Sequence, residues 1–309
     1  MRIIGPDELH FGVDDMEACR GFLTDFGLTE SEPGVFEAKD GTCFVIKDMA
    51  DADLPPALPT GNKLRRTVYG VEDTASLDEI AAELSRDREV TRGENGSVEA
   101  VDDLGFALRF QITRRHAFEV EPELVNTPGV AAGRPANKHG INLEAETLPL
   151  TLSHVVYFVP DIPKMEAFYV ERLKFRVVDR FKGMGPFLTP LASTDHHTLF
   201  LIQTPEYMKG IEHAAFHMQG PTSLMLAGNK MRNKGYETFW GPGRHQFGSN
   251  WFWYFKSPMG CAVEYDADMD RLDEAWLPRE LPASAEVAQA FLLQAIDKWA
   301  PGGPPPEAE

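Results

Sequence analysis

The sequence predicts an α+β fold of two tandem domains, each built from two βαβββ modules that form an incomplete barrel. Two observations carry this prediction. The chain repeats itself at a nearly constant offset, and each copy alternates one helix with short strands rich in β-branched and aromatic residues. The length of 309 residues fits two domains of ordinary size.

The repeat is visible along most of the chain. A constant offset of 147 residues pairs Asp14 with Asp161, Phe22 with Tyr169, Leu28 with Phe175, residues 64–69 with 211–216, and Ser76 with Ser223. Residues 103–110 then match 258–265 at a longer offset, so about eight residues are inserted near 241–250. A repeat that holds through several segments predicts two copies of one domain.

The extent of the two copies divides the chain into four parts. Residues 1–115 form the first domain, 116–150 a linker rich in Pro, Gly, Asn and Ala, 151–272 the second domain, and 273–309 a tail. Each domain opens with a strand and a helix, and the expected elements are strands 8–15 and 152–161, helices 16–26 and 163–173, helices that open near Ser76 and Ser223, and strands 251–256 and 261–266. The tail predicts a helix over Ala285–Trp299, followed by a frayed Pro- and Gly-rich end.

Charge and cysteine usage exclude several classes of protein. The net charge of −18, without a dense Lys/Arg cluster, disfavours binding to nucleic acid or to an anionic membrane. No apolar run reaches the ~18–20 residues of a membrane span, and the N-terminus shows no secretory signal. The three cysteines are widely spaced and odd in number, which predicts reduced, buried thiols in a cytoplasmic protein.

The second domain carries a predicted metal site. His154 lies mid-strand, His213 follows at the equivalent place of the next module, and Glu264 lies in the last strand. Two imidazoles and one carboxylate can hold one face of an octahedral ion and leave positions open for substrates, the arrangement of Fe(II) oxygenases. We expect the first domain to carry no metal, because the offset places Asp7, Arg66 and Arg109 at the matching positions. Its His10 is predicted to be structural.

Further proton-handling side chains follow in the second domain. The turn 241–245 ends in His245, and Tyr254 comes nine residues later, ten residues before Glu264. His196 and His197 precede an apolar strand. If that strand begins at the histidine pair, the two rings point to opposite faces, with Phe200 and Ile202 on the face of His196. Asp266, Asp268 and Asp270 alternate beyond the last strand and are expected to be a solvated acidic end.

The ligand spacing, the Gly241–His245 turn, and the steps from His245 to Tyr254 and on to Glu264 resemble those of type I extradiol ring-cleaving dioxygenases. These enzymes belong to the vicinal oxygen chelate superfamily, and the resemblance covers about residues 3–270. It implies that the three ligands bind Fe(II), with Mn(II) as an alternative. It also implies that His245 and Tyr254 flank a bound catechol, and that His197, rather than His196, lies beside dioxygen.

The resemblance implies a homo-oligomeric, cytoplasmic enzyme of aromatic catabolism that cleaves a catechol-type diol next to its hydroxyl groups. Four further residues are candidates for the substrate pocket, each also explained by ordinary packing: His217, Phe187, Asn250 and Phe252. Two alternative functions stay open on the same scaffold. One is a 2-oxo-acid-dependent oxygenase of the 4-hydroxyphenylpyruvate dioxygenase type, and the other is a non-catalytic small-molecule binding protein. Which catechol is bound, and what the tail does, also stay open.

Overall fold

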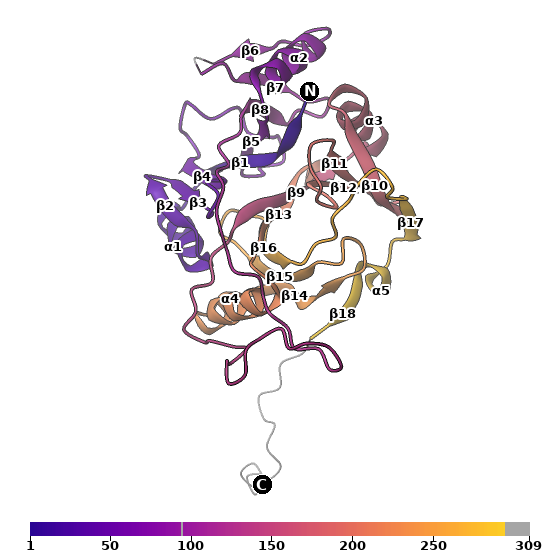
Figure 1. Cartoon of the computed structure of the whole chain (residues 1–309). Coiled ribbons are helices and arrows are strands. Elements are labelled where there is room, and N and C mark those ends of the chain that lie inside the picture. Colours follow the sequence, from indigo (N-terminus) through magenta and orange to yellow (C-terminus); the bar gives the residue numbers. More distant parts are fainter. Residues whose placement is uncertain (94, 294–309) are drawn as a thin grey trace, which may run out of the picture.

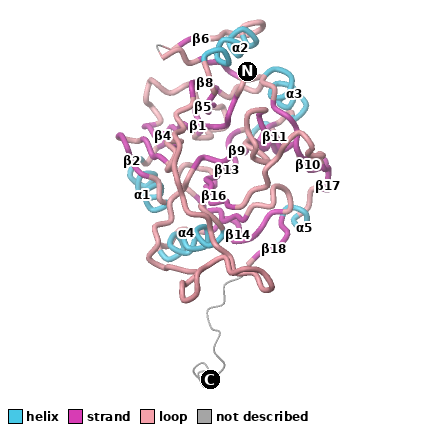
Figure 2. Tube along the Cα trace, in the orientation of Figure 1, coloured by secondary structure: helices cyan, strands magenta, loops and turns pink. Residues whose placement is uncertain are grey.

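The computed structural model describes residues 1–93 and 95–293, and it shows two β-sheets that share one hydrophobic core (Figure 1). The first sheet has the strand order β2-β3-β4-β1-β5-β8-β7-β6, and the second has the order β17-β10-β11-β12-β9-β13-β16-β15-β14-β18. Strands fill the centre of the molecule and the longer helices lie at its outside (Figure 2).

The first half holds two modules that each run strand, helix and three strands. Their elements are β1 (Ile3–Val13), α1 (Met16–Phe26), β2 (Thr29–Glu32), β3 (Val35–Glu37), β4 (Cys43–Asp48), β5 (Leu64–Val71), α2 (Thr74–Leu84), β6 (Thr91–Arg92), β7 (Val98–Val101) and β8 (Ala107–Ile112).

The second half repeats this order. Its elements are β9 (Thr151–Val159), α3 (Ile162–Ala167), a π-helical turn (Phe168–Arg172), β10 (Phe175–Lys182), β11 (Gly185–Pro190), β12 (Leu199–Gln203), a 3-10 turn (Glu206–Met208), β13 (Gly210–His217), α4 (Pro221–Asn233), β14 (Thr238–His245), β15 (Trp251–Lys256) and β16 (Ala262–Ala267). The α+β class and the βαβββ modules predicted from the repeat are therefore confirmed.

Each sheet is centred on the first strands of its two modules. β1 pairs antiparallel with β5, and β9 pairs antiparallel with β13 in the same way. β13 also lies parallel to β16, as β5 lies parallel to β8. The strands that carry the three predicted metal ligands are therefore neighbours in the second sheet, in the order β9, β13, β16.

The register of the two sheets corrects one match made from the sequence. Ala215 of β13 lies opposite His154, and the equivalent residue of β5, Val68, lies opposite Glu8. Glu8, and not Asp7, is therefore the counterpart of His154, because the offset is one residue shorter in the first strand. Asp7 instead accepts hydrogen bonds from Arg114 and Arg115 at the start of the linker.

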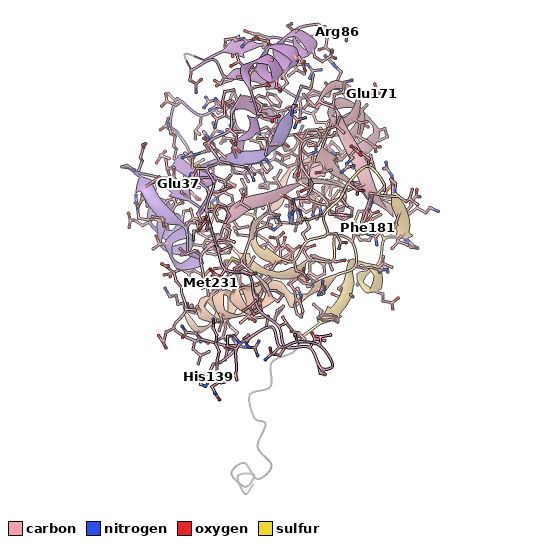
Figure 3. All side chains as sticks on the ribbon, in the orientation of Figure 1. Glu37, Arg86, His139, Glu171, Phe181 and Met231 are labelled. Atoms are coloured by element: carbon pink, nitrogen blue, oxygen red, sulfur yellow. The ribbon has the colours of Figure 1, made fainter. Side chains whose placement is uncertain are left out.

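Aromatic side chains join the two halves. The rings of Phe26 and Tyr265 stack at a centroid distance of 3.9 Å, and the hydroxyls of Thr67 and Tyr157 lie 2.5 Å apart. All these side chains are buried, and each pair joins one half of the chain to the other. The two halves therefore stabilise each other through one continuous core (Figure 3).

The linker has no helix or strand and runs along the surface past α4 (Figure 1). Glu123 accepts a hydrogen bond from the backbone N–H of Thr222, and Lys230 donates to the carbonyl of Ala145. Among the described residues, no helix combines the length and apolarity needed to cross a membrane.

The prediction of a long tail helix is wrong for the part of the tail that the structure describes. This part forms β17 (Arg279–Pro282), a single helical turn α5 (Ala285–Ala288) and β18 (Gln289–Leu292), and the remainder of the predicted helix and the frayed end lie outside the described residues. β17 pairs with β10 and β18 pairs with β14. Both strands cover edges of the second sheet, where unpaired backbone groups form hydrogen bonds with an added strand. An isolated helix of this length is only marginally stable, so pairing with the sheet prevails.

Candidate active site

Three side chains from adjacent strands converge on one point of the second sheet. His154 on β9 and Glu264 on β16 both lie opposite Ala215 of β13, and His213 comes two residues earlier on β13. The two Nε2 atoms lie 3.2 Å apart, and each lies 3.2–3.3 Å from Oε2 of Glu264. One ligand atom from each residue falls within 4.8 Å of the others.

The donor set fits a divalent cation. Glu264 is fully buried, and neither of its carboxylate oxygens has a hydrogen-bond partner among the described residues. A buried carboxylate without a partner is strongly unfavourable, and a cation held between it and two imidazoles removes that penalty. Burial alone would raise the pKa of the Glu264 carboxyl, but the contacts with His154, His213 and His245 hold it well below its usual range. Two imidazoles and a carboxylate suit Fe(II) or Mn(II).

Hydrogen bonds at Nδ1 orient the imidazole rings of both His154 and His213. The Nδ1 atom of His213 contacts the carboxylate of Glu212. Nδ1 of His154 donates to the hydroxyl of Ser153 at 2.9 Å, and this hydroxyl donates onward to Asp266 at 2.9 Å. These partners fix each ring so that Nε2 faces the proposed ion.

The sequence did not identify Glu212, Ser153 or Asp266 as functional. Asp266 was expected in a solvated acidic end, and that prediction is wrong, because the residue is fully buried. It continues β16 opposite His217, whose Nδ1 lies 2.7 Å from its carboxylate. An acidic residue two positions after a ligand in the same strand was the available signal.

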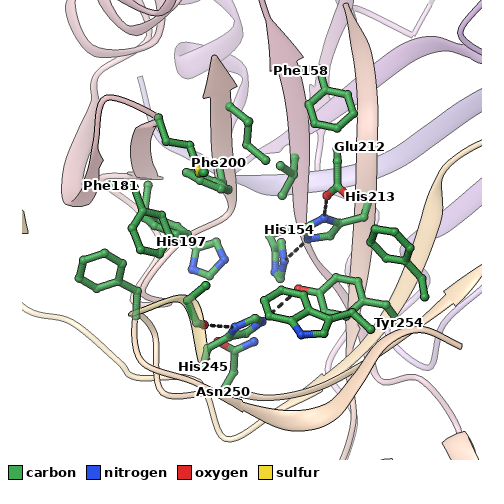
Figure 4. A pocket seen from close by; sticks show the side chains of 18 residues that line it. His154, Phe158, Phe181, His197, Phe200, Glu212, His213, His245, Asn250 and Tyr254 are labelled. Carbon is green, nitrogen blue, oxygen red and sulfur yellow. Dashed lines mark hydrogen bonds and ion pairs between the residues drawn. The ribbon is translucent and has the colours of Figure 1, made fainter. Parts of the chain in front are cut away.

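His245 and Tyr254 form a hydrogen-bonded pair beside the ligands. His245 Nδ1 lies 2.8 Å from the carbonyl oxygen of Ala288, which can only accept, so Nδ1 carries the proton. His245 Nε2 therefore accepts the hydrogen bond from the Tyr254 hydroxyl, 3.0 Å away. Burial raises the pKa of Tyr254 well above its ordinary value. Figure 4 shows this pair below the two ligand histidines.

His197 and His213 lie on opposite sides of His154, and His197 lies towards Phe181 and Phe200 (Figure 4). The centroids of its ring and of the His154 ring are 4.4 Å apart. Burial lowers the pKa of His197 well below its ordinary value. His196 is fully buried and is not among the residues that line the cavity.

The prediction that Phe200 and Ile202 share a face with His196 is wrong. Both side chains line the same cavity as His197. β12 begins only at Leu199, so the alternation of a strand does not extend back to the histidine pair.

A cavity of about 300 Å³ opens beside these groups. The apolar residues that line it are Val156, Phe158, Phe181, Met184, Phe187, Phe200, Ile202, Phe239, Trp240, Phe247 and Ala288. Its polar lining consists of His154, His197, Glu212, His213, His245, Asn250 and Tyr254, so no Lys or Arg side chain of the described residues lines it. Most of the lining residues lie on strands of the second sheet, and Ala288 lies in α5.

The four predicted pocket residues separate into two groups. Phe187 and Asn250 line the cavity, and neither amide atom of the buried Asn250 has a hydrogen-bond partner among the described residues. Phe252 and His217 are not among the lining residues. The ring of Phe252 stacks on the ring of His245 at 4.0 Å, and His217 pairs with Asp266.

Comparison with known proteins agrees with this geometry. Residues 151–265 match the Glyoxalase/Bleomycin resistance protein/Dioxygenase superfamily. The matched residues include His154, His213 and Glu264. It is similar to metapyrocatechase 2 of Cupriavidus necator, with 32% identity over 183 residues, 58% of this chain and 54% of that relative. The match thus spans about half the length of that relative.

A second relative aligns along most of its length. Biphenyl-2,3-diol 1,2-dioxygenase of Paraburkholderia xenovorans (strain LB400) is 28% identical over 287 residues, 86% of this chain and 88% of the relative.

Solved structures share the fold. The Mn(II)-bound glyoxalase of Novosphingobium aromaticivorans has a TM-score of 0.74 at 19% identity and covers 94% of this chain and 91% of its own. The 2,2',3-trihydroxybiphenyl 1,2-dioxygenase of Sphingomonas wittichii strain RW1 has a TM-score of 0.69 at 18% identity and covers 94% and 98%.

Proposed function

We propose that this protein is an extradiol dioxygenase that uses dioxygen to open the ring of a catechol-type aromatic diol, in aromatic compound degradation. The observation that carries the proposal is the cavity itself. His154 and His213, which cluster with the buried Glu264, line it together with the non-ligand groups His197, His245 and Tyr254. A site that only held a metal would not need this second set of proton-handling side chains.

The three ligands would hold Fe(II), or Mn(II) in its place, and leave positions open for two substrates. When bound, the ion would supply the redox chemistry between the diol and dioxygen. The chain supplies binding, orientation and proton transfer.

The His245 and Tyr254 pair would take the first proton from the diol. The Tyr254 hydroxyl donates to Nε2 of His245, so its oxygen is free to accept a proton from a substrate hydroxyl. As that proton arrives, the hydroxyl proton of Tyr254 passes to His245. The Ala288 carbonyl then stabilises the imidazolium through its hydrogen bond to Nδ1.

His197 would serve the opposite side of the cavity. Its ring lies against His154 and is almost fully buried, at 4% exposed. A hydrogen-bonding group in a site that excludes water interacts strongly with charge that develops on a reacting oxygen. We therefore assign His197 to the dioxygen side, where it stabilises the developing charge and later delivers a proton.

The lining also indicates the substrate class. The apolar lining includes phenylalanines, Met184 and Ile202, and no cationic side chain of the described residues in the lining offers an ion pair to a carboxylate. Glu212 adds negative charge at the cavity wall. We propose a diol with an apolar substituent, because a carboxylated catechol would lose its hydration without gaining a partner.

Oxygen uptake by the Fe(II)-loaded protein tests the proposal. The protein is loaded with Fe(II) under anaerobic conditions and then transferred to oxygenated buffer. Catechol and its alkyl or aryl derivatives should cause oxygen uptake, and a carboxylated catechol should react much more slowly. Uptake that requires a 2-oxo acid would favour the alternative oxygenase. Binding of diols without any uptake, with Fe(II) or with Mn(II), would favour a binding protein. A cytoplasmic location and a homo-oligomeric state stay predictions from the sequence.

A further inference from the structure

A line of buried side chains leads away from His197 on the side opposite the cavity. Nδ1 of His197 lies 3.1 Å from Nδ1 of His196. Nε2 of His196 lies 2.8 Å from Oδ2 of Asp179 on β10. His196 and Asp179 are both fully buried, so no solvent competes for these contacts.

The far end of this line fixes the direction of its hydrogen bonds. Oδ1 of Asp179 accepts the backbone N–H of Arg279 at 2.7 Å, and the guanidinium of Arg279 also donates to the carboxylate. These contacts keep Asp179 ionised, and an ionised carboxylate only accepts. Nε2 of His196 must therefore carry a proton, which leaves Nδ1 of a neutral His196 as an acceptor.

The same reasoning sets the state of His197. Because Nδ1 of His196 accepts, Nδ1 of His197 must donate, and a neutral His197 then has an unprotonated Nε2. His197 lines the cavity, and its contact with His196 is made by Nδ1 and not by Nε2. A free imidazole exchanges between its two tautomers, and this arrangement selects one of them.

We infer that Asp179 and His196 are positioning residues that hold His197 with its Nδ1–H directed away from the cavity and an unprotonated Nε2 directed into it. Nε2 is thereby ready to receive a proton and deliver it later. The catalytic consequence rests on the proposed function, but the tautomer of His197 does not.

The C-terminal segment anchors this arrangement. β17 pairs with β10 so that Arg279 lies opposite Asp179. The guanidinium of Arg279 packs over the rings of Phe247 and Trp276, at 5.0 and 5.2 Å from their centroids. The tail, to which the sequence assigned no role, thus fixes the carboxylate at the end of the line.

Nitrogen-15 NMR of metal-free, full-length protein with labelled histidines tests the inference without any turnover. At alkaline pH, where free imidazole is neutral, His197 should be protonated at Nδ1 and His196 at Nε2. The spectra of His197→Gln and His196→Gln assign the two residues. A His197 protonated at Nε2 would overturn the inference.

Kinetics of the Fe(II)-loaded enzyme give a second test. His196→Leu removes both hydrogen bonds, so kcat should fall on the order of 10–100-fold while KM for the diol and the iron content stay unchanged. His196→Gln keeps an acceptor for His197 and a donor for Asp179, so it should restore kcat to within about threefold of wild type. Equal losses in both variants, or turnover near wild type in His196→Leu, would contradict a positioning role.

His10 provides a matched control. It is also a buried imidazole paired with a carboxylate, 2.7 Å from Glu8, but it lies in the first sheet. His10→Leu should lower stability without changing kcat or the tautomer of His197. A wild-type enzyme that takes up no oxygen would refute the proposed function and leave the NMR result to decide the inference on its own.

Discussion

Glu264 is fully buried, and its carboxylate oxygens have no hydrogen-bond partner among the described residues, although two imidazole nitrogens lie 3.2–3.3 Å from one of them. Such an arrangement is stable only when a cation or protons compensate the charge. The buried carboxylate thus explains why we expect a cation here, and it gives the Nε2 atoms of both histidines a negatively charged neighbour.

Replacing a ligand should remove the metal. In Glu264→Ala or His213→Ala, we expect bound iron and turnover to fall by at least about tenfold, because two remaining donors hold the ion weakly. Elemental analysis measures the iron, and thermal unfolding checks the fold. Arg109 lies opposite Val68 as Glu264 lies opposite Ala215, so Arg109→Gln is the matched control and should keep its iron. Full iron occupancy in Glu264→Ala would refute the assignment.

Proton transfer should be separable from metal binding. His245→Phe and Tyr254→Phe each remove one member of the hydrogen-bonded pair and no ligand. General acid–base assistance contributes about 10²–10⁴-fold, so kcat should fall by that range while iron is retained. Steady-state oxygen uptake measures the effect, and rates near wild type in both variants would show that the pair is only structural.

A variant of His197 tests its role in the reaction with dioxygen. His197→Gln should bind the diol normally and then react slowly with oxygen, since the amide hydrogen-bonds but cannot deliver a proton. Stopped-flow mixing of the anaerobic enzyme–diol complex with oxygenated buffer measures the step. Normal reaction in His197→Gln together with slow reaction in His196→Gln would transfer the role to His196.

For individual residues, the sequence predicted the reactive side chains better than the groups that orient them. His154, His213, Glu264, His245, Tyr254 and His197 lie together in the structure, and their roles stay predictions. The partners behind them were missed for physical reasons. Asp266 follows the ligand Glu264 by two residues, but its hydrogen bond with Ser153 is known only from the folded structure, and Ala288 contributes a backbone carbonyl, which no side-chain pattern reveals.

At the scale of elements, helix α4 illustrates how packing outweighs propensity. Gly228 lies in its interior, and a Cβ atom there would come within 2.1 Å of the Trp253 ring on β15. Glycine is unfavourable in a helix by about 1 kcal/mol relative to alanine. Its position here is explained by the close approach of the helix to the sheet.

Two glycine-to-alanine substitutions test this account. Gly228→Ala should destabilise the protein by about 1–3 kcal/mol, because the clash exceeds the gain in helix propensity. Gly21→Ala in α1 is the control, since a Cβ there meets nothing within 4 Å, and it should stabilise by about 0.5–1 kcal/mol. Denaturant unfolding measures both. A stabilising Gly228→Ala would show that α4 moves away from the sheet without loss.

The elements that the sequence predicted well are those that their own residues determine. Helix α1 spans the predicted residues because Asp15 accepts the hydrogen bond of Ala18 at its start and Gly27 adopts φ 100° at its end. The tail was mispredicted because β18 forms only in the presence of β14, with Arg244 opposite Phe291. Long-range pairing of this kind leaves no local signal.

At the scale of the whole molecule, duplication explains why one half can hold a site while the other does not. The positions equivalent to the ligands carry Glu8, Arg66 and Arg109 in the first sheet. Arg66 and Arg109 both form ion pairs with Glu99, so these two positions carry cationic side chains that offer no ligand to a metal. The repeat predicted this asymmetry, but the residue that matches His154 could be fixed only by strand register.

The central claim is that the second sheet holds a metal at which both atoms of dioxygen enter the substrate. Turnover of an alkyl- or aryl-substituted catechol by Fe(II)-loaded enzyme under ¹⁸O₂, followed by mass spectrometry, tests it most directly. We predict one ring-opened product that carries label from both oxygen atoms, with no product from Glu264→Ala. A product carrying a single labelled atom, or a reaction that requires a 2-oxo acid and places one labelled atom in the carboxylate formed when that acid loses CO₂, would contradict the account.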